Sequence, residues 1–321
     1  MRKSTIVWLS IGGGLILLGA LLFTIVMSFH QWDFMRLDNM KYETNTYEIQ
    51  EEFHNIRIDT DTADLEFLPS EDGSTKVVCY ESIKTRHITK VTDQTLSVCL
   101  NDTRKWYDYI TIFNFNSPKI TVYLPTGEYA DLKIDEHTGE VTLPKDFSFE
   151  SISVKTSTGN VNCQASASGH LQIKTSTGAI RISDLTAGSI NLSVSTGDIS
   201  VSSVTCEKEI RFKVDTGDTK LTDLTCESLI SEGDTGDITM KNVIASKKFD
   251  IERSTGDLKF ERCDAGELFI DTDTGNVKGS LLSEKIFIVR SDTGSINVPK
   301  STSGGRCEIE TDTGDIKITV E

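Results

Sequence analysis

The stretch "STGDI" at residues 195–199 recurs as "DTGDI" at 234–238 and 312–316, and as "STGDL" at 254–258. When the chain is aligned on this Thr-Gly step, ten copies appear, and threonine precedes the glycine in every one. The glycines stand 19 or 20 residues apart, at Gly139, Gly159, Gly178, Gly197, Gly217, Gly236, Gly256, Gly275, Gly294 and Gly314. A constant period of this length indicates stacked structural repeats.

The residues on both sides of each Thr-Gly step alternate between apolar and polar. The position seven before the glycine is apolar in all ten copies, and the positions five before, two after and four after each have one exception: Ser231, Thr219 and Gly279. Alternation with a period of two predicts half-buried strands, so each repeat is interpreted as strand, corner, strand and return. The sequence therefore predicts an all-β parallel solenoid with 19–20-residue coils and four internal apolar columns. The glycines form the structural corners, because glycine adopts positive φ without a Cβ penalty. A propeller is disfavoured, since its blades need about 40 residues or more.

A diverged first coil is predicted at 46–67, where "DTDTADLEF" (59–67) has Ala63 in place of the glycine. Residues 68–130 lack the motif and are predicted to be inserted strands, around 77–80, 96–100, 110–115 and 120–124, that cap the membrane-proximal end. The ten Thr-Gly coils then occupy 131–321. Because the sequence ends at Glu321, soon after Ile316 and Ile318, we expect an open edge at this C-terminal coil. That edge is either protected by the charges of Lys317 and Glu321 or pairs edge to edge with another chain.

A hydrophobic segment near the N-terminus, residues 6–29, contains 24 residues without a charge. As a helix it would rise about 36 Å, enough to cross the ~30 Å hydrocarbon core of a bilayer. Arg2 and Lys3 precede it, which favours a cytoplasmic N-terminus (1–5), a transmembrane helix (6–29), a linker (30–45) and an extracytoplasmic β domain. A cleaved signal peptide is the alternative, although its apolar region is typically only 7–15 residues long. We predict a single-pass protein of the cell membrane whose first partner is the lipid bilayer.

The recurring "STGDI", "DTGDI" and "STGDL" segments resemble a bacterial β-strand-repeat family described as "putative adhesins", a domain of unknown function. The resemblance covers residues 46–321. It implies a right-handed β-solenoid displayed on the cell envelope, often behind one transmembrane helix, and some members are similar to components of Gram-positive envelope-stress systems. It implies no catalytic residues.

Aspartates surround the Thr-Gly corners in two sets. Asp198, Asp218, Asp237 and Asp257 follow the glycine, and Asp215, Asp234, Asp273, Asp292 and Asp312 precede the threonine. Stacked carboxylates repel one another, and calcium could relieve that repulsion. Aspartate is also a common turn residue, and the sequence contains no recognisable calcium-coordinating loop. The sequence therefore predicts no metal site, with structural calcium as the open alternative.

Six aromatic residues lie within 18 positions: Trp106, Tyr107, Tyr109, Phe113, Phe115 and Tyr123. If exposed, such a cluster is a possible binding patch for sugar or protein. A cluster of this kind is also typical of the core of a small sheet.

The seven cysteines include one pair at equivalent positions of neighbouring coils. Cys206 and Cys226 both lie nine residues after a corner glycine, which would place their Cα atoms ~5 Å apart and permit a disulfide. Cys163 and Cys307 instead fall in apolar columns, where a thiol behaves as a small hydrophobic group.

Enzyme signatures are missing from the sequence. It contains no phosphate-binding loop, no G-x-S-x-G elbow, no H-E-x-x-H and no C-x-x-C. The net charge of −16 argues against nucleic-acid binding. We predict a non-enzymatic envelope protein without cofactor that binds a cell-surface ligand through its lateral faces or its far tip. The alternatives are envelope-stress sensing through a membrane protein partner and, with fold as its only support, a polysaccharide lyase.

Overall fold

The computed structural model describes residues 3–29, 31–32, 41–106 and 117–321. It contains one helix, α1 (Lys3–Phe29), followed by a 23-stranded sheet. Within α1, Val7–Phe29 has a mean hydropathy of 2.3 and is long and apolar enough to cross a membrane.

The strands fall into two groups. The first coil and its neighbours comprise β1 (Tyr42–Ile49), β2 (Asn55–Thr62), β3 (Asp64–Pro69), β4 (Thr75–Ser82), β5 (Thr85–Thr92), β6 (Thr95–Asp102) and β7 (Lys119–Leu124). The Thr-Gly coils comprise β8 (Gly127–Thr138), β9 (Val141–Leu143), β10 (Phe147–Thr158), β11 (Val161–Cys163), β12 (Ser166–Thr177), β13 (Ile180–Thr196), β14 (Ile199–Cys206), β15 (Glu209–Thr216), β16 (Thr219–Thr235), β17 (Ile238–Thr255), β18 (Leu258–Thr274), β19 (Val277–Leu281), β20 (Lys285–Thr293), β21 (Ile296–Asn297), β22 (Gly305–Thr313) and β23 (Ile316–Val320).

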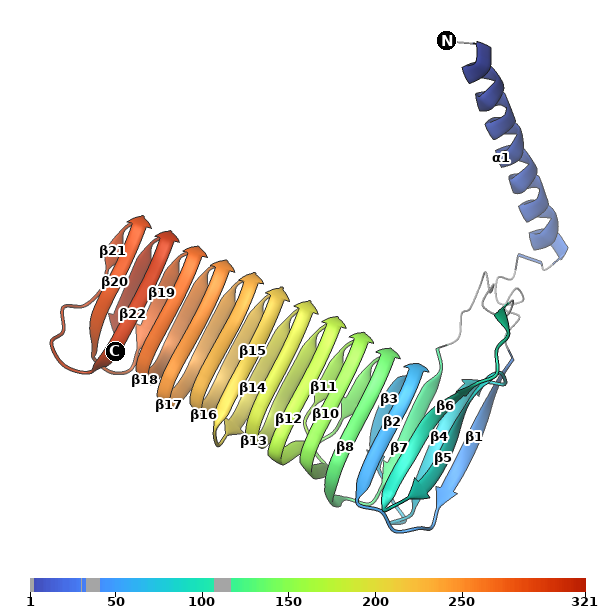
Figure 1. Ribbon diagram of the computed structural model, residues 1–321, viewed down its shortest axis with the longest axis horizontal. Coiled ribbons are helices and arrows are strands. Elements are labelled where there is room, and N and C mark those ends of the chain that lie inside the picture. Colours follow the sequence, from blue (N-terminus) through green and yellow to red (C-terminus); the bar gives the residue numbers. More distant parts are fainter. Residues whose placement is uncertain (1–2, 30, 33–40, 107–116) are drawn as a thin grey trace.

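The strands of the Thr-Gly coils pair in parallel with the equivalent strands of the next coil, and the rungs climb along a rod (Figure 1). Equivalent repeat positions face one another in register, for example Leu132 with Ile152 and Ile152 with Leu171. These apolar side chains are almost fully buried and form one continuous core. The predicted parallel solenoid of Thr-Gly coils behind one apolar helix is confirmed.

The corners are held by a ladder of backbone hydrogen bonds. In nine of the ten Thr-Gly copies the N–H of the corner glycine donates to the carbonyl of the threonine at the neighbouring corner, as Gly197 does to Thr216 at 2.9 Å. Gly197 has a φ of 139°, and a Cβ built on it would overlap the carbonyl group of Gly178. A side chain would therefore both strain the backbone and separate neighbouring coils.

The last two coils are stacked out of sequence order. β22 pairs with β18 on one side and with β20 on the other, and β23 likewise lies between β19 and β21. The expectation of an open edge at the C-terminal coil is wrong, because β20 and β21 form the edge instead. Self-association of the chain stays a prediction.

An ion pair spans this inserted coil. Lys285, in the edge coil, is paired with Gly305 of the inserted coil, and its Nζ lies 2.7 Å from Oδ1 of Asp264 in the coil beyond. Lys285 is only 3 % exposed, so its long side chain runs along the rod. The repeats have apolar residues at the same positions, so any coil can stack on any other. The 19–20-residue period therefore does not determine the order in which the coils stack. Specific contacts such as this ion pair favour the observed order.

Strands β1 and β4–β7 cover the end of the rod next to the first coil. β6 pairs in parallel with β2, and β7 with β3, so the first coil has neighbours on both sides. β4 continues this layer antiparallel to β7 and β1, while β5 pairs with β6. The strand expected at 110–115 lies outside the described residues.

An inward column in which eight of eleven residues are polar or charged runs through the rod just before the corners. We call the residues three before each corner the inner corner column: Thr60, Glu136, Thr156, Thr175, Val194, Val214, Gly233, Arg253, Thr272, Thr311 and Ser291. Glu136 is 1 % exposed, and neither carboxylate oxygen has a hydrogen-bond partner among the described residues. Burial, and to a lesser degree the charge of Asp64, raise the pKa of Glu136 to about 8.

Replacement of a corner glycine should be strongly destabilising. We expect Gly197→Ala to lower the free energy of unfolding by about 3 kcal/mol or more, because the Cβ combines backbone strain with overlap against Gly178. Urea denaturation followed by circular dichroism measures this. Gly127→Ala is the control, since Gly127 has open space around its Cα. Equal stability of the two variants would contradict the proposed role of the corner.

Glu136 should make stability fall as the pH rises. Its folded-state pKa lies above the unfolded value, so the folded state holds the proton more tightly, and stability is lost as pH rises toward about 8. Between about pH 6 and pH 9, the wild type should lose about 3 kcal/mol relative to Glu136→Gln. Glu128→Gln, at an exposed position of the same strand, is the control. Parallel pH profiles for wild type and Glu136→Gln would refute the expected shift.

Candidate functional site

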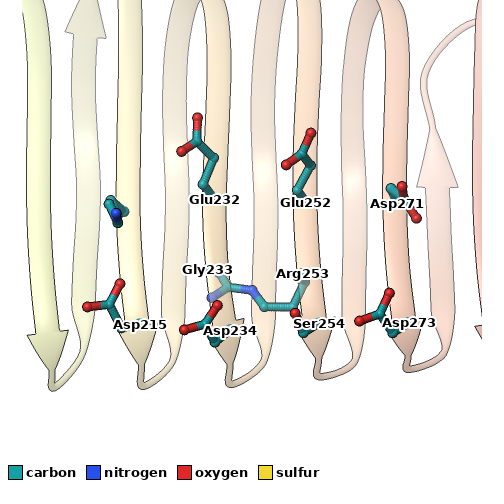
Figure 2. A pocket seen from close by; sticks show the side chains of 10 residues that line it. Asp215, Glu232, Gly233, Asp234, Glu252, Arg253, Ser254, Asp271 and Asp273 are labelled. Atoms are coloured by element: carbon teal, nitrogen blue, oxygen red, sulfur yellow. The ribbon is translucent and has the colours of Figure 1, made fainter.

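Carboxylates gather on one outward face of the rod, along β15–β18. We call this surface the acidic face and define it as Asp215, Glu232, Asp234, Glu252, Asp271 and Asp273. Glu232, Glu252 and Asp271 are register partners on successive rungs, and Asp215, Asp234 and Asp273 form a second row nearer the corners (Figure 2). Rungs are ~4.8 Å apart, so the first row repeats negative charge at that interval, while Ser254 interrupts the second row between Asp234 and Asp273.

A hollow of about 360 Å³ lies on this face, with Arg253 among the residues that line it. Arg253 belongs to the inner corner column and is only 2 % exposed. Its side chain lies across Gly233, and Nη1 donates to the carbonyl of Val214 at 3.1 Å (Figure 2). A Cβ on Gly233 would overlap this guanidinium, so the glycine leaves the space that the arginine occupies.

The charges of the face are only partly compensated within the protein. Glu232 pairs with Arg211 at 2.9 Å, whereas the other five carboxylates form no ion pair with any described residue. Burial lowers the pKa of Arg253, and the nearby charges of Asp234 and Asp218 act in the opposite direction. The acidic face therefore provides the counter-charge for the buried guanidinium and keeps an excess of negative charge toward solvent.

The geometry of the acidic face is suited to binding a ligand through polar contacts spread over several rungs. Carboxylates accept hydrogen bonds from ammonium, guanidinium and hydroxyl groups, and a surface of one sign attracts ligands of the opposite sign. The hollow is bounded by only a few adjacent rungs of one face. It differs from the mostly apolar clefts that enclose small molecules.

The aspartates that follow the glycines have a different role. Oδ1 of Asp198 accepts the backbone N–H of Asp218 at 2.9 Å, and Asp218, Asp237 and Asp257 repeat this contact with the next coil at 2.8 Å. These bonds lower the pKa of Asp257. None of the corner aspartates belongs to a convergent group of metal ligands in the described part of the chain. Their contacts support the structural interpretation rather than calcium binding.

The predicted aromatic patch is described only in part. Trp106 is 78 % exposed, and Tyr123, on β7, is half-buried beneath Lys76, whose Nζ lies 4.6 Å from the ring centroid. Tyr107, Tyr109, Phe113 and Phe115 lie outside the described residues. A binding role for this patch stays a prediction.

The two cysteines of the predicted disulfide lie on adjacent coils as free, buried thiols. The Cys206 thiol donates to backbone carbonyls, and burial raises the pKa of Cys226 to about 12. The disulfide stays a prediction.

The sequence analysis did not single out Arg253 as a buried residue of the site, although the repeat contains a sign of its position. An arginine falls at an inward position of the repeat, and the preceding copy has glycine, not a side chain, at that position. This pairing of a long residue with a missing side chain could have indicated a side chain directed along the rod.

The parallel coils and the acidic face define the class of protein. It is a repeat protein, a β-solenoid with long lateral surfaces. A family model described as Toastrack DUF4097 matches residues 53–213 and 206–321, so the chain belongs to this family. This agrees with the resemblance derived from the Thr-Gly segments.

One solved structure shares the fold at low sequence identity, and two others show a weaker similarity. A "putative adhesin" from Parabacteroides distasonis is 13 % identical with a TM-score of 0.51, covering 75 % of this chain and 98 % of its own. A "putative lipid binding protein" from the same species is 17 % identical, with a TM-score of 0.49 and coverage of 74 % and 96 %. A "putative adhesin" from Bacteroides fragilis is 18 % identical, with a TM-score of 0.44 and coverage of 87 % and 97 %. The comparison with curated proteins gave no match.

The aspartate ladder should depend on an acceptor oxygen and not on calcium. We expect Asp257→Ala to lower the free energy of unfolding by about 1 kcal/mol, because the N–H of Asn276 loses its acceptor. Asp257→Asn should be close to neutral at pH 7, since Asn276 itself accepts an N–H through Oδ1. Urea denaturation with and without a chelator distinguishes the two roles. A rise in wild-type stability on adding calcium, absent in the variants, would contradict this expectation.

Proposed function

We propose that this protein is a non-enzymatic, membrane-anchored component of the cell envelope that binds a cationic surface ligand through its acidic face. The anchor is the apolar helix Val7–Phe29, which follows Arg2 and Lys3, so that the solenoid extends on the outer side of the cytoplasmic membrane. The observation that carries the binding role is the double row of carboxylates along β15–β18.

The layout of these carboxylates supports a polymeric or protein ligand. Side chains on successive rungs are held at strand spacing by a rigid backbone, so a ligand with repeated positive charges can contact several of them at once. Binding through many weak contacts needs no deep cleft. The expected ligand class is therefore a basic protein segment or a cationic surface polymer.

A role without catalysis agrees with the chemistry of the face. Besides the six carboxylates, the hollow is lined by Lys213, Ser254, Gly233 and the buried Arg253, and no histidine or cysteine is among these lining residues. The description of the Parabacteroides distasonis relative as a "putative adhesin" is consistent with surface binding.

Neutralising the acidic face should remove most of the binding. The experiment uses full-length protein in nanodiscs and a poly-lysine surface as the probe. A variant with all six carboxylates replaced by amides (Asp215→Asn, Glu232→Gln, Asp234→Asn, Glu252→Gln, Asp271→Asn, Asp273→Asn) should bind at least about 10-fold more weakly, and wild-type binding should weaken with salt.

The control changes the same number of charges elsewhere on the surface. Glu71, Glu128, Asp131, Asp146, Glu150 and Glu207 are exposed and lie off the acidic face. If their amide variant loses as much affinity as the acidic-face variant, net charge alone explains the binding and the proposed site is wrong.

A further inference from the structure

Three buried side chains with metal-binding groups converge in the strands that cover the first coil. They are Cys79 and Glu81, on β4, and His87, on β5, which are 0 %, 1 % and 3 % exposed. One Sγ, one carboxylate oxygen and one ring nitrogen lie within 4.8 Å of one another. They form the one such group of three in the described part of the chain.

The strand geometry explains why these groups meet. Cys79 and Glu81 are two residues apart, so they point to the same inward face of β4. The chain then turns, with Ser82 paired to Thr85, and β5 brings His87 back against Glu81. The backbone N–H of His87 donates to Oε2 of Glu81 at 2.6 Å, which fixes the carboxylate beside the ring.

Neighbouring groups orient two of the three side chains from outside. Nε2 of His87 lies 2.9 Å from Oγ1 of Thr60, in the inner corner column, while Nδ1 lies 2.6 Å from Oε2 of Glu81. The amide of Asn45 donates to the other carboxylate oxygen, Oε1, at 2.8 Å. Such outer contacts are typical of metal sites, where a ligating histidine is held by a hydrogen bond at its second nitrogen.

The order Thr60, His87, Glu81 also matches a nucleophile, base and acid, but it does not support hydrolysis. Thr60 is 2 % exposed and lies in the core of the first coil, so a substrate cannot reach its hydroxyl. The Cys79 thiol, moreover, forms no hydrogen bond with any described residue. A catalytic triad of Thr60, His87 and Glu81 would therefore not explain why Cys79 lies beside them. A metal ion would use all three groups.

We propose that Cys79, Glu81 and His87 form a binding site for a single divalent transition-metal ion, with Zn²⁺ as the expected occupant. Thiolate, imidazole and carboxylate are the ligand types that zinc takes in proteins, and the mixture of sulfur and nitrogen disfavours calcium and magnesium. The ion would lie among Sγ of Cys79, Nδ1 of His87 and an oxygen of Glu81, and Nδ1 and Oε2, which are 2.6 Å apart, would separate to bind it.

Charge and proton balance agree with this assignment. Binding would release the thiol proton of Cys79 and would require His87 to carry its ring proton on Nε2, from which it can donate to Oγ1 of Thr60. The thiolate and the Glu81 carboxylate then neutralise the two charges of the ion, which removes most of the cost of burying it. The bound ion would tie β4 and β5 to the first coil, so its binding energy would stabilise the covered end of the rod.

The test uses full-length protein, stripped with a chelator and titrated with Zn²⁺, and with Co²⁺ as a spectroscopic substitute. We expect one ion per chain, a cobalt–thiolate charge-transfer band and a higher unfolding midpoint with metal. Cys79→Ser and His87→Gln should abolish the band and weaken binding by at least about 100-fold, and Thr60→Val should weaken it about 10–100-fold.

Cys99→Ala is the matched control, because Cys99 lies on β6, which pairs with β5, but is not part of the group. It should keep both the band and the affinity. If Cys79→Ser does not fold, the proposal is tested by the charge-transfer band of the wild type and by its loss in His87→Gln. Folded wild-type protein that binds no ion, a cobalt complex without a thiolate band, or a band that persists in a folded Cys79→Ser or His87→Gln variant would overturn the proposal.

Discussion

The close contact between neighbouring corners is the constraint on which this molecule depends. At nine of the ten Thr-Gly corners the glycine N–H donates to the threonine carbonyl of a neighbouring coil, and a Cβ on the glycine would overlap backbone there. Once these backbones touch, the flanking strands are held in parallel register, and the apolar positions are superimposed into continuous columns. The repeat therefore specifies a rod whose outer surface can vary without disturbing its core.

The sequence predicted this part well because each repeat carries the same local information. The Thr-Gly period located the corners, and the alternation on both sides located the buried columns, including the first coil with Ala63 in place of glycine. Such features depend on steric and hydrophobic rules that act within about ten residues. They recur often enough in the chain for one irregular copy to be recognised.

The parts that the sequence did not predict depend on contacts between coils. The stacking of β22 between β18 and β20 is linked to an ion pair from Lys285 to Asp264 across Gly305, and no periodicity encodes that choice. The acidic face likewise becomes visible only when residues about 20 apart are placed side by side. A repeat that makes the fold predictable makes the order of its copies ambiguous, because every copy fits every neighbour.

The inner corner column connects the features that distinguish this chain from a uniform solenoid. It contains three buried polar residues of this kind: Thr60 beside His87, Arg253 beneath the acidic face, and Glu136, whose carboxylate has no hydrogen-bond partner among the described residues. Two of these polar groups reach backbone carbonyls at the corner, Arg253 at Val214 and the hydroxyl of Thr311 at Gly275, whereas the hydroxyls of Thr156 and Thr272 have no hydrogen-bond partner among the described residues. The four apolar columns supply the hydrophobic core that holds neighbouring coils together. Of the fourteen buried polar or charged residues in the described part of the chain, seven belong to the inner corner column, so this column holds a large share of the features that distinguish one coil from another.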